Sequence, residues 1–206
     1  MRLPFVPTDG CCRVCGRQAV GLDGEFLCDD CRGPDRPHFD RAGSALRFEN
    51  EARQMILDFK FNRHLWLRDD FADWLEAAAR TRFKVGEIDL VLPMPTQFFH
   101  RIDRGYNQCD YLAGALAKRL GKPLARRTVG RVGRFERQGG LNEERRRENV
   151  IGTFDVRRPR RVAGRTVFVV DDIMTTGATL SECARTLKDA GASRVWCLSL
   201  ARTVRD

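Results

Sequence analysis

The sequence lacks any run of about 18 consecutive apolar residues, the length that a helix needs to cross a lipid bilayer. Its first ten residues, MRLPFVPTDG, also lack the long apolar segment of a secretory signal peptide. The first absence argues against membrane insertion, and the second argues against export. We therefore expect a cytoplasmic protein that does not insert into a membrane.

The 206 residues are 42% hydrophobic, which is enough for one main core and a small appendage. Four of the eight cysteines form two C-x2-C pairs, and the other four are scattered. Two such pairs, with 12 residues between them, supply the four tetrahedral sulfur ligands that Zn2+ prefers. Because no coordination position would remain open for water, the pattern predicts a structural Zn2+ site made of Cys12, Cys15, Cys28 and Cys31.

These pairs predict a zinc-ribbon module over residues 1–40, followed by a main domain over residues 41–206. Cys11 could replace Cys12 as a ligand with a small shift in register. The alternative to a metal site is a set of unrelated core cysteines, which the spacing disfavours.

The main domain shows strands that alternate with helices. Residues 167–170 are all apolar, as in a strand buried on both faces of a parallel sheet. Residues 178–190 have helical periodicity and end before Gly191, and residues 194–202 predict the next strand. A second unit combines a short strand that breaks at Pro93 and Pro95 with a helix over 107–120. The pattern predicts an α/β fold with a parallel sheet flanked by helices.

Residues 49–83 predict two amphipathic helices that are separated near 62–70. Lys60 lies between two phenylalanines in the first of them. This pattern favours a surface lysine whose aliphatic stem covers its apolar neighbours.

The stretch VFVVDDIMTTGAT, residues 167–179, carries the clearest chemical signal. Ligands of parallel sheets bind at the carboxyl ends of the strands, where two aspartates and a hydroxyl-rich loop follow each other here. Hydroxyls and free N–H groups at a helix N-terminus favour a phosphate, and the carboxylates suit ligand hydroxyls or a divalent cation. The stretch predicts a ribose 5-phosphate site rather than an ordinary Ser/Thr helix cap, and its residues are Asp171, Asp172, Thr175, Thr176, Gly177, Ala178 and Thr179.

This stretch closely resembles the 5-phosphoribosyl 1-pyrophosphate (PRPP) motif of type I phosphoribosyltransferases. The resemblance implies a type I phosphoribosyltransferase-like parallel sheet. It also implies that Asp171 and Asp172 bind the ribose hydroxyls, as the catalytic acid pair, and that residues 175–179 bind the 5-phosphate. Some purine phosphoribosyltransferases carry an acidic residue that can act as general base at the position of Thr175, and this sequence has no carboxylate there.

The cysteine module, LPMP (92–95), RGYNQ (104–108), QGGLNEERRRENVIGTF (138–154) and the PRPP motif together resemble the ComF family, in matching order. This resemblance implies a phosphoribosyltransferase-like protein associated with competence and DNA uptake. It implies a pyrophosphate, held with Mg2+, near Pro95, Arg101 and Arg104, and a flap at about 130–148. Two departures are the uncharged stretch Gln97–Phe99 with His100, where basic residues are expected, and Phe135, where threonine is usual.

The charge distribution suggests a second class of function. Between Arg101 and Arg165 there are 18 Lys or Arg against 7 Asp or Glu, a net charge of +11, whereas the whole chain carries +9. This concentration favours a non-enzymatic module that binds single-stranded DNA and keeps the PRPP pocket as a regulatory or vestigial site. Against it, the arginine-rich stretch 127–161 contains only two aromatic residues that could stack on bases. Other competence proteins are further candidate partners, and the acceptor of a phosphoribosyl transfer is not identified.

Overall fold

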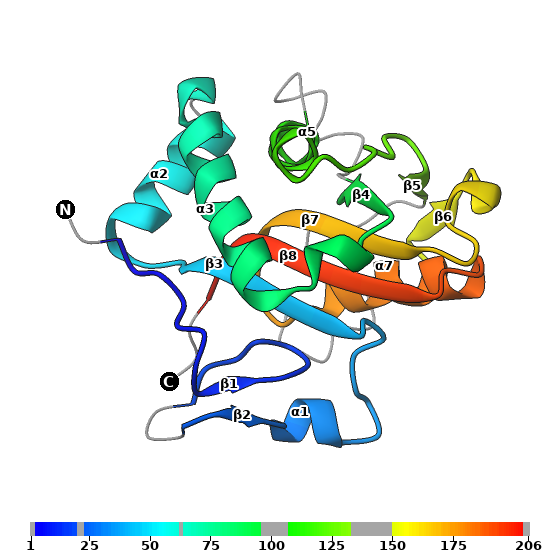
Figure 1. The fold of residues 1–206 in the computed structure, drawn as a ribbon, viewed down its shortest axis with the longest axis horizontal. Helices are drawn as coiled ribbons and strands as arrows, with labels where there is room; N and C mark the ends of the chain where they lie inside the picture. The colour runs from blue at the N-terminus through cyan, green and yellow to red at the C-terminus, as the bar shows by residue number, and fades with distance from the viewer. Residues whose placement is uncertain (1–2, 20–22, 62–63, 96–106, 133–149, 204–206) are drawn as a thin grey trace.

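A computed structural model describes residues 3–19, 23–61, 64–95, 107–132 and 150–203 of the chain. Its centre is a four-stranded, fully parallel sheet in the order β3-β8-β7-β4 (Figure 1). These strands are β3 (Arg41–Arg47), β4 (Leu90–Pro93), β7 (Thr166–Met174) and β8 (Arg194–Arg202). The predicted parallel α/β architecture of a type I phosphoribosyltransferase-like fold is confirmed.

Helices cover both faces of the sheet, and two small sheets and three short 3-10 turns accompany it among the described residues. The helices are α1 (Asp29–Arg32), α2 (Asn50–Phe61), α3 (Arg68–Arg82), α5 (Gln108–Leu120) and α7 (Ala178–Asp189). Short 3-10 turns lie at η1 (Leu65–Leu67), η2 (Val85–Glu87) and η3 (Pro159–Arg161). Two small sheets pair β1 (Cys11–Cys12) with β2 (Glu25–Phe26), and β5 (Val129–Arg131) with β6 (Phe154–Val156).

The alternation of side chains along β7 divides the core into two parts. Phe168 and Val170 pack with the apolar faces of α2, α3 and α5 on one side of the sheet. Val167 and Val169 pack on the other side with α7 and with the cysteine module. All four side chains are fully buried, and each contributes about 1.5–3 kcal/mol by leaving water. Burial on both faces explains why this run is continuously apolar.

Strand β7 continues further than its apolar run predicts. Its pairing with β8 extends to Met174, opposite Arg202, so Asp171 and Asp172 lie within the strand rather than after it. The reason is that β8 supplies hydrogen-bonding partners along its whole length, and backbone pairing does not depend on side-chain polarity. The bounds of β8 agree with the predicted strand.

Local capping signals explain the ends of α5. Asn107 precedes the helix and its side chain accepts a hydrogen bond from the Cys109 N–H at 3.0 Å. Gly121 ends the helix in the left-handed conformation, with φ of 63°. Helix α3 begins at Arg68, slightly earlier than predicted, directly after η1. Among the described residues, no helix combines the length and the apolar character that spanning a membrane requires.

The cysteine module, which we define as residues 3–40, packs directly against the main sheet. The four cysteines of the C-x2-C pairs belong to the same apolar cluster as Phe39, Met174 and Leu180. The Ala42 N–H donates to the Val14 carbonyl at 2.6 Å. Gly16 has φ of +68°, and a Cβ there would lie 2.8 Å from the Ala42 carbonyl oxygen. The module therefore shares a core with the sheet, while a domain boundary at residue 40 stays a prediction.

We expect Gly16→Ala to destabilise the protein more than Gly24→Ala does. Both glycines have positive φ, which costs an alanine about 1–2 kcal/mol, but only Gly16 has backbone where the new Cβ would lie. The clash should add about 1–3 kcal/mol. Urea unfolding of the two variants measures the difference. Equal losses would contradict the close approach of the module to β3.

Candidate functional site

The two aspartates of β7 carry carboxylate oxygens that lie within 4.8 Å of each other, beside the first turn of α5. Asp172 continues the series of Phe168 and Val170, so it meets the elements on the α2 and α5 side. Its Oδ2 accepts hydrogen bonds from Lys60 Nζ and Gln108 Nε2, both at 2.7 Å. The Ile173 N–H donates to its Oδ1 at 2.6 Å. Asp172 is thus a buried carboxylate that accepts three hydrogen bonds and keeps acceptor capacity on Oδ1.

Lys60 corrects the prediction of a surface lysine. Its side chain is only 17% exposed and forms the ion pair with Asp172 across the carboxyl end of the sheet. It lies in the last turn of α2, directly after the fully buried Phe59, so its stem enters the core side of the helix. A buried carboxylate needs a compensating cation, and that requirement is the signal that could have identified Lys60.

Asp171 has a different electrostatic environment from its neighbour. The Cys109 thiol donates to Asp171 Oδ1 at 3.4 Å, and burial keeps the pKa of that thiol well above its usual range. Burial, and then the negative charge of Asp172, raise the pKa of Asp171 to about 7. Burial would also raise the pKa of Asp172, but Lys60 and Gln108 hold it below its usual value. Near neutral pH, the ionised Asp172 therefore lies beside Asp171, which is protonated part of the time.

The loop after β7 brings backbone N–H groups to the start of α7. Gly177 precedes the helix with φ of 82°, and no side chain caps it, so an ordinary Ser/Thr cap is absent at this position. A φ of 82° lies in the left-handed region, which L side chains rarely adopt, and this explains the glycine. The Ala178 N–H donates to Thr176 Oγ1 at 3.2 Å, and Thr175 is exposed. A helix N-terminus in this arrangement favours an anion.

Residues 175–178 of this loop line two pockets. A small one of about 40 Å³ contains Thr175, and a larger one of about 630 Å³ contains Thr176, Gly177 and Ala178. Arg17 and Arg202 line both of them. The larger pocket lies between α7 and the cysteine module, where the His38 N–H donates to Ser181 Oγ at 2.9 Å. The loop thus borders positively charged side chains from two other parts of the chain.

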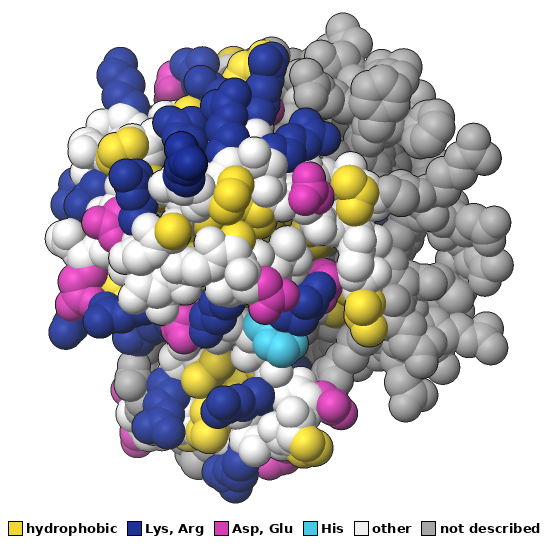
Figure 2. Space-filling model, turned by 90° about the vertical axis from the view of Figure 1, so that its right-hand side faces the viewer, with side chains coloured by type: hydrophobic (Ala, Val, Ile, Leu, Met, Phe, Trp, Pro, Cys, Tyr) yellow, Lys and Arg dark blue, Asp and Glu magenta, His cyan; other side chains and the backbone are white. Residues whose placement is uncertain are grey.

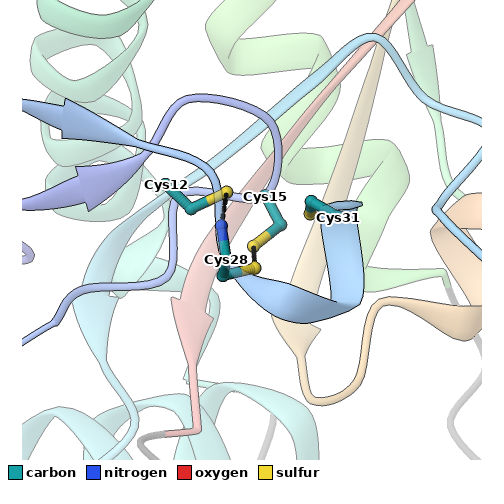
Figure 3. Close-up of side chains that lie close together, drawn as sticks. All are labelled: Cys12, Cys15, Cys28 and Cys31. Carbon is teal, nitrogen blue, oxygen red and sulfur yellow. Dashed lines mark hydrogen bonds between the residues drawn. The ribbon is translucent and has the colours of Figure 1, made fainter. Parts of the chain in front are cut away.

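Four buried cysteines face one another in the cysteine module (Figure 3). Their sulfur atoms all lie within 4.8 Å of one another, Cys15 Sγ and Cys28 Sγ at 3.6 Å, and the Cys28 N–H donates to Cys12 Sγ at 3.5 Å. The group consists of Cys12, Cys15, Cys28 and Cys31, whereas the Cys11 thiol donates to the Pro7 carbonyl at 3.2 Å. Four converging thiols fit a metal with a closed tetrahedral shell, and the geometry favours Cys12 over Cys11.

Comparison with known proteins agrees with this geometry. Residues 107–205 match the family model "Phosphoribosyl transferase domain". Competence protein F of Haemophilus influenzae is 27% identical over 96% of this chain and 92% of its own length. The DNA utilization protein YhgH of Escherichia coli K12 is also 27% identical, over 92% of this chain and 89% of its own length. These similarities support the assignment of this chain to the ComF family.

Solved structures similar to this chain include a glutamine PRPP amidotransferase from B. subtilis complexed with ADP and GMP. That structure is 19% identical, with a TM-score of 0.44, and the match covers 65% of this chain and 26% of the other.

Several predicted residues of this chain fall outside its described part. Arg101, Arg104 and most of the predicted flap are among them, as are residues 133–149 of the arginine-rich stretch 127–161. Pro95 is described and half-buried beyond the end of β4, where Asn107 Nδ2 donates to the Met94 carbonyl at 3.3 Å. The pyrophosphate site and the binding of single-stranded DNA stay predictions.

The structure also adds residues to which the sequence analysis assigned no role. Gln108 ends the RGYNQ motif, and its Nε2 donates to Asp172, while its buried Oε1 has no hydrogen-bond donor among the described residues. Arg17 and Arg202 are separated by most of the chain, so only the fold brings them to the loop. The position of Gln108 in the motif could have signalled a role, and no local pattern signals the two arginines.

The raised pKa of Asp171 predicts a pH dependence of stability. Its ordinary value is 3.8, so the stability that the protonated form provides is present below about pH 4 and lost as the pH rises to about 7. Wild type should therefore lose stability relative to Asp171→Asn over this window, by at most about 4 kcal/mol at 1.36 kcal/mol per pKa unit. Urea unfolding between pH 4 and pH 8 measures the difference.

Asp73→Asn is the control, because Asp73 is 63% exposed. Its difference from wild type should stay flat over the same pH range. A flat difference for Asp171→Asn as well would contradict the proposed protonation of Asp171.

Proposed function

We propose that this ComF-family protein binds PRPP at the carboxyl end of β7. The observation that carries the proposal is the order of groups there, with two buried carboxylates followed by a glycine-bent loop and the N-terminus of α7. The loop residues Thr175, Thr176, Gly177, Ala178 and Thr179 would bind the 5-phosphate. Asp171 and Asp172 would bind the ribose hydroxyls.

The surroundings of the carboxylates support recognition of hydroxyl groups. An ionised carboxylate only accepts hydrogen bonds, so Asp172 suits a hydroxyl donor. Gln108 Oε1 is a second acceptor, which is buried and has no donor among the described residues. An unpaired buried acceptor costs about 1–3 kcal/mol, and a ribose hydroxyl would remove that cost. Because α5 fixes both Gln108 and Cys109 beside the acids, the acceptors are held in place before the ligand arrives.

If the protein transfers phosphoribosyl groups, these side chains would act by positioning and by charge. Mg2+ bound with PRPP would stabilise the departing pyrophosphate. Pro95, Arg101 and Arg104 would hold the pyrophosphate, and Asp171 and Asp172 would orient the ribose for attack at its C1. Lys60 adds a positive charge next to Asp172 at the same edge of the sheet. No carboxylate replaces the purine-activating acid at Thr175, so the acceptor chemistry differs from that route.

The names of the relatives support a biological role in DNA uptake or processing. They are called a competence protein and DNA utilization proteins. Positive charge gathers on this chain as well, as Figure 2 shows for the upper part of one face. A pocket of about 890 Å³ between α3 and α5 is also lined by basic residues, among them Arg68, Lys118 and Arg126. Single-stranded DNA therefore stays the second candidate partner.

We also propose that the four-cysteine group holds a structural Zn2+. Elemental analysis of gently purified protein should find about one zinc per chain. Cys12→Ser should lower that content, while Cys11→Ser should not, since Cys11 donates to the Pro7 carbonyl outside the group. Equal zinc loss in both variants would contradict the assignment of Cys12, and no zinc in the wild type would contradict the site.

The PRPP proposal is tested by calorimetry on Asp172→Asn. A charge-assisted hydrogen bond contributes about 1.5–3 kcal/mol, so PRPP affinity should fall about 10- to 100-fold. Asp73→Asn removes an exposed carboxylate from α3 and should leave the affinity unchanged. Unchanged affinity in Asp172→Asn would place the PRPP site elsewhere. Pyrophosphate release from PRPP, measured with and without added bases, then separates a transferase from a binding protein.

A further inference from the structure

Arg202 is a buried cation at the edge of the candidate phosphate site. It is the last residue of β8 and lies opposite Met174, the last residue of β7. The loop that begins at Thr175 therefore starts beside it. Arg202 is only 7% exposed. Its position places a guanidinium at the carboxyl end of the sheet, on the strand next to the loop.

The hydrogen bonding of Arg202 leaves most of its charge without a partner. Nη1 donates to the Cys15 carbonyl at 3.0 Å, which uses one of the five N–H donors of a guanidinium. Among the residues that the structure describes, no carboxylate lies within ion-pair distance of Arg202. Two buried carboxylates differ from Arg202 in this respect, because Asp172 forms an ion pair with Lys60 and Glu182 forms one with Arg185. A buried charge without a counter-charge costs several kcal/mol.

Arg17 lines the same two pockets as Arg202, so two like charges lie near the loop that begins at Thr175. Arg17 itself pairs with Asp30, so its charge is partly compensated. An anion placed between the two guanidiniums would remove the repulsion and supply the missing partner for Arg202.

Such an anion would lie in the two pockets beside the loop. The larger pocket is also lined by three carboxylates, of which Asp30 and Glu182 already pair with arginines and Asp35 is the third. Arg202 and Arg17 line both the pocket that contains Thr175 and the pocket that contains Thr176, Gly177 and Ala178. The two arginines thus border the loop that leads into the N-terminus of α7. Arg82, the other buried arginine among the described residues, donates to the carbonyls of Val6 and Pro7 and lines neither pocket. Arg202 alone combines burial, missing counter-charge and access to this loop.

We infer that Arg202 binds the phosphate monoester of the ligand together with the loop at Thr175–Ala178, and that the cysteine module positions it through the Cys15 carbonyl. The inference rests on the proposed phosphate site and goes beyond it because it divides the phosphate subsite between the main sheet and the cysteine module. The module contributes Arg17 and the Cys15 carbonyl that orients Arg202. Disruption of the four-cysteine group should therefore weaken phosphate binding.

The competing explanation is that Arg202 only compensates negative charge on the cysteine thiolates. Arg202 donates to the carbonyl of Cys15, one of the four cysteines, which is consistent with such a role. The two explanations differ in what the loss of Arg202 changes. If Arg202 only compensates charge, its loss should weaken metal retention and leave phosphate affinity unchanged. If Arg202 binds phosphate, its loss should weaken phosphate affinity and leave metal retention unchanged.

The test uses the full chain and compares Arg202→Gln with Arg194→Gln. Arg194 lies at the opposite end of β8, is exposed and pairs with Glu87, so it is matched in strand and in charge change. Ribose 5-phosphate and inorganic phosphate are titrated by calorimetry, and zinc content and circular dichroism are recorded for each variant. We expect Arg202→Gln to weaken both ligands at least 10-fold, and Arg194→Gln to bind them like the wild type.

Arg202→Lys keeps the charge but not the planar fork, so it should fold and bind phosphate with intermediate affinity. It decides the question if Arg202→Gln does not fold. Unchanged affinity in Arg202→Gln, or in Arg202→Lys where only that variant folds, overturns the inference, and so does loss of zinc alone.

The wild type distinguishes this inference from the proposed function. If it binds ribose 5-phosphate through Arg202 but does not bind PRPP, the inference stands and the proposed function fails. If the wild type binds PRPP with no dependence on Arg202, the proposed function stands and the inference fails. If it binds no phosphate compound, both fail.

Discussion

The burial of two adjacent carboxylates at the end of a central strand is the constraint on which the site depends. A buried carboxylate without a counter-charge costs several kcal/mol of folding free energy, and two adjacent ionised carboxylates would also repel each other. The two aspartates therefore have different partners. Asp172 stays ionised because α2 brings Lys60 and α5 brings Gln108 to it, whereas Asp171 can keep a proton. The last turn of α2 and the first turn of α5 must therefore converge on the end of β7, and this requirement fixes how the helices cover that face of the sheet.

Local signals predicted the elements that local physics determines. The bounds of β8 and the caps of α5 follow from apolar runs, Asn107 and Gly121, which act within a few residues. The end of β7 could not be predicted from its apolar run, because the pairing with β8 continues beyond the apolar residues. The prediction for Lys60 was wrong for a related reason. Helical periodicity describes the neighbours along the helix, and the partner of Lys60 lies more than a hundred residues away in β7.

The cysteine module shows the same division between local and long-range information. Cysteine spacing predicted which four residues would converge, because ligand geometry constrains spacing directly. It left Cys11 and Cys12 as alternatives, and only the turn that points Cys11 toward Pro7 separates them. Nothing in the spacing indicates that Gly16 packs on Ala42, or that Cys15 offers its carbonyl to Arg202. These contacts turn a module that could have been a separate appendage into one wall of the pocket beside α7.

The arrangement places opposite charges at the two ends of one short segment. Asp171 and Asp172 present acceptors at one end, and the loop at Thr175–Ala178 with Arg17 and Arg202 presents donors at the other. A ligand that carries only negative charge would satisfy the arginines but would be repelled by the ionised Asp172. A ligand that carries only hydroxyls would leave the buried Arg202 without a counter-charge. A sugar phosphate meets both demands, since its hydroxyls donate to the acids while its phosphate accepts from the guanidiniums. The chemistry of this segment therefore favours a phosphorylated sugar over a bare anion, and that preference separates it from the basic surface elsewhere on the chain.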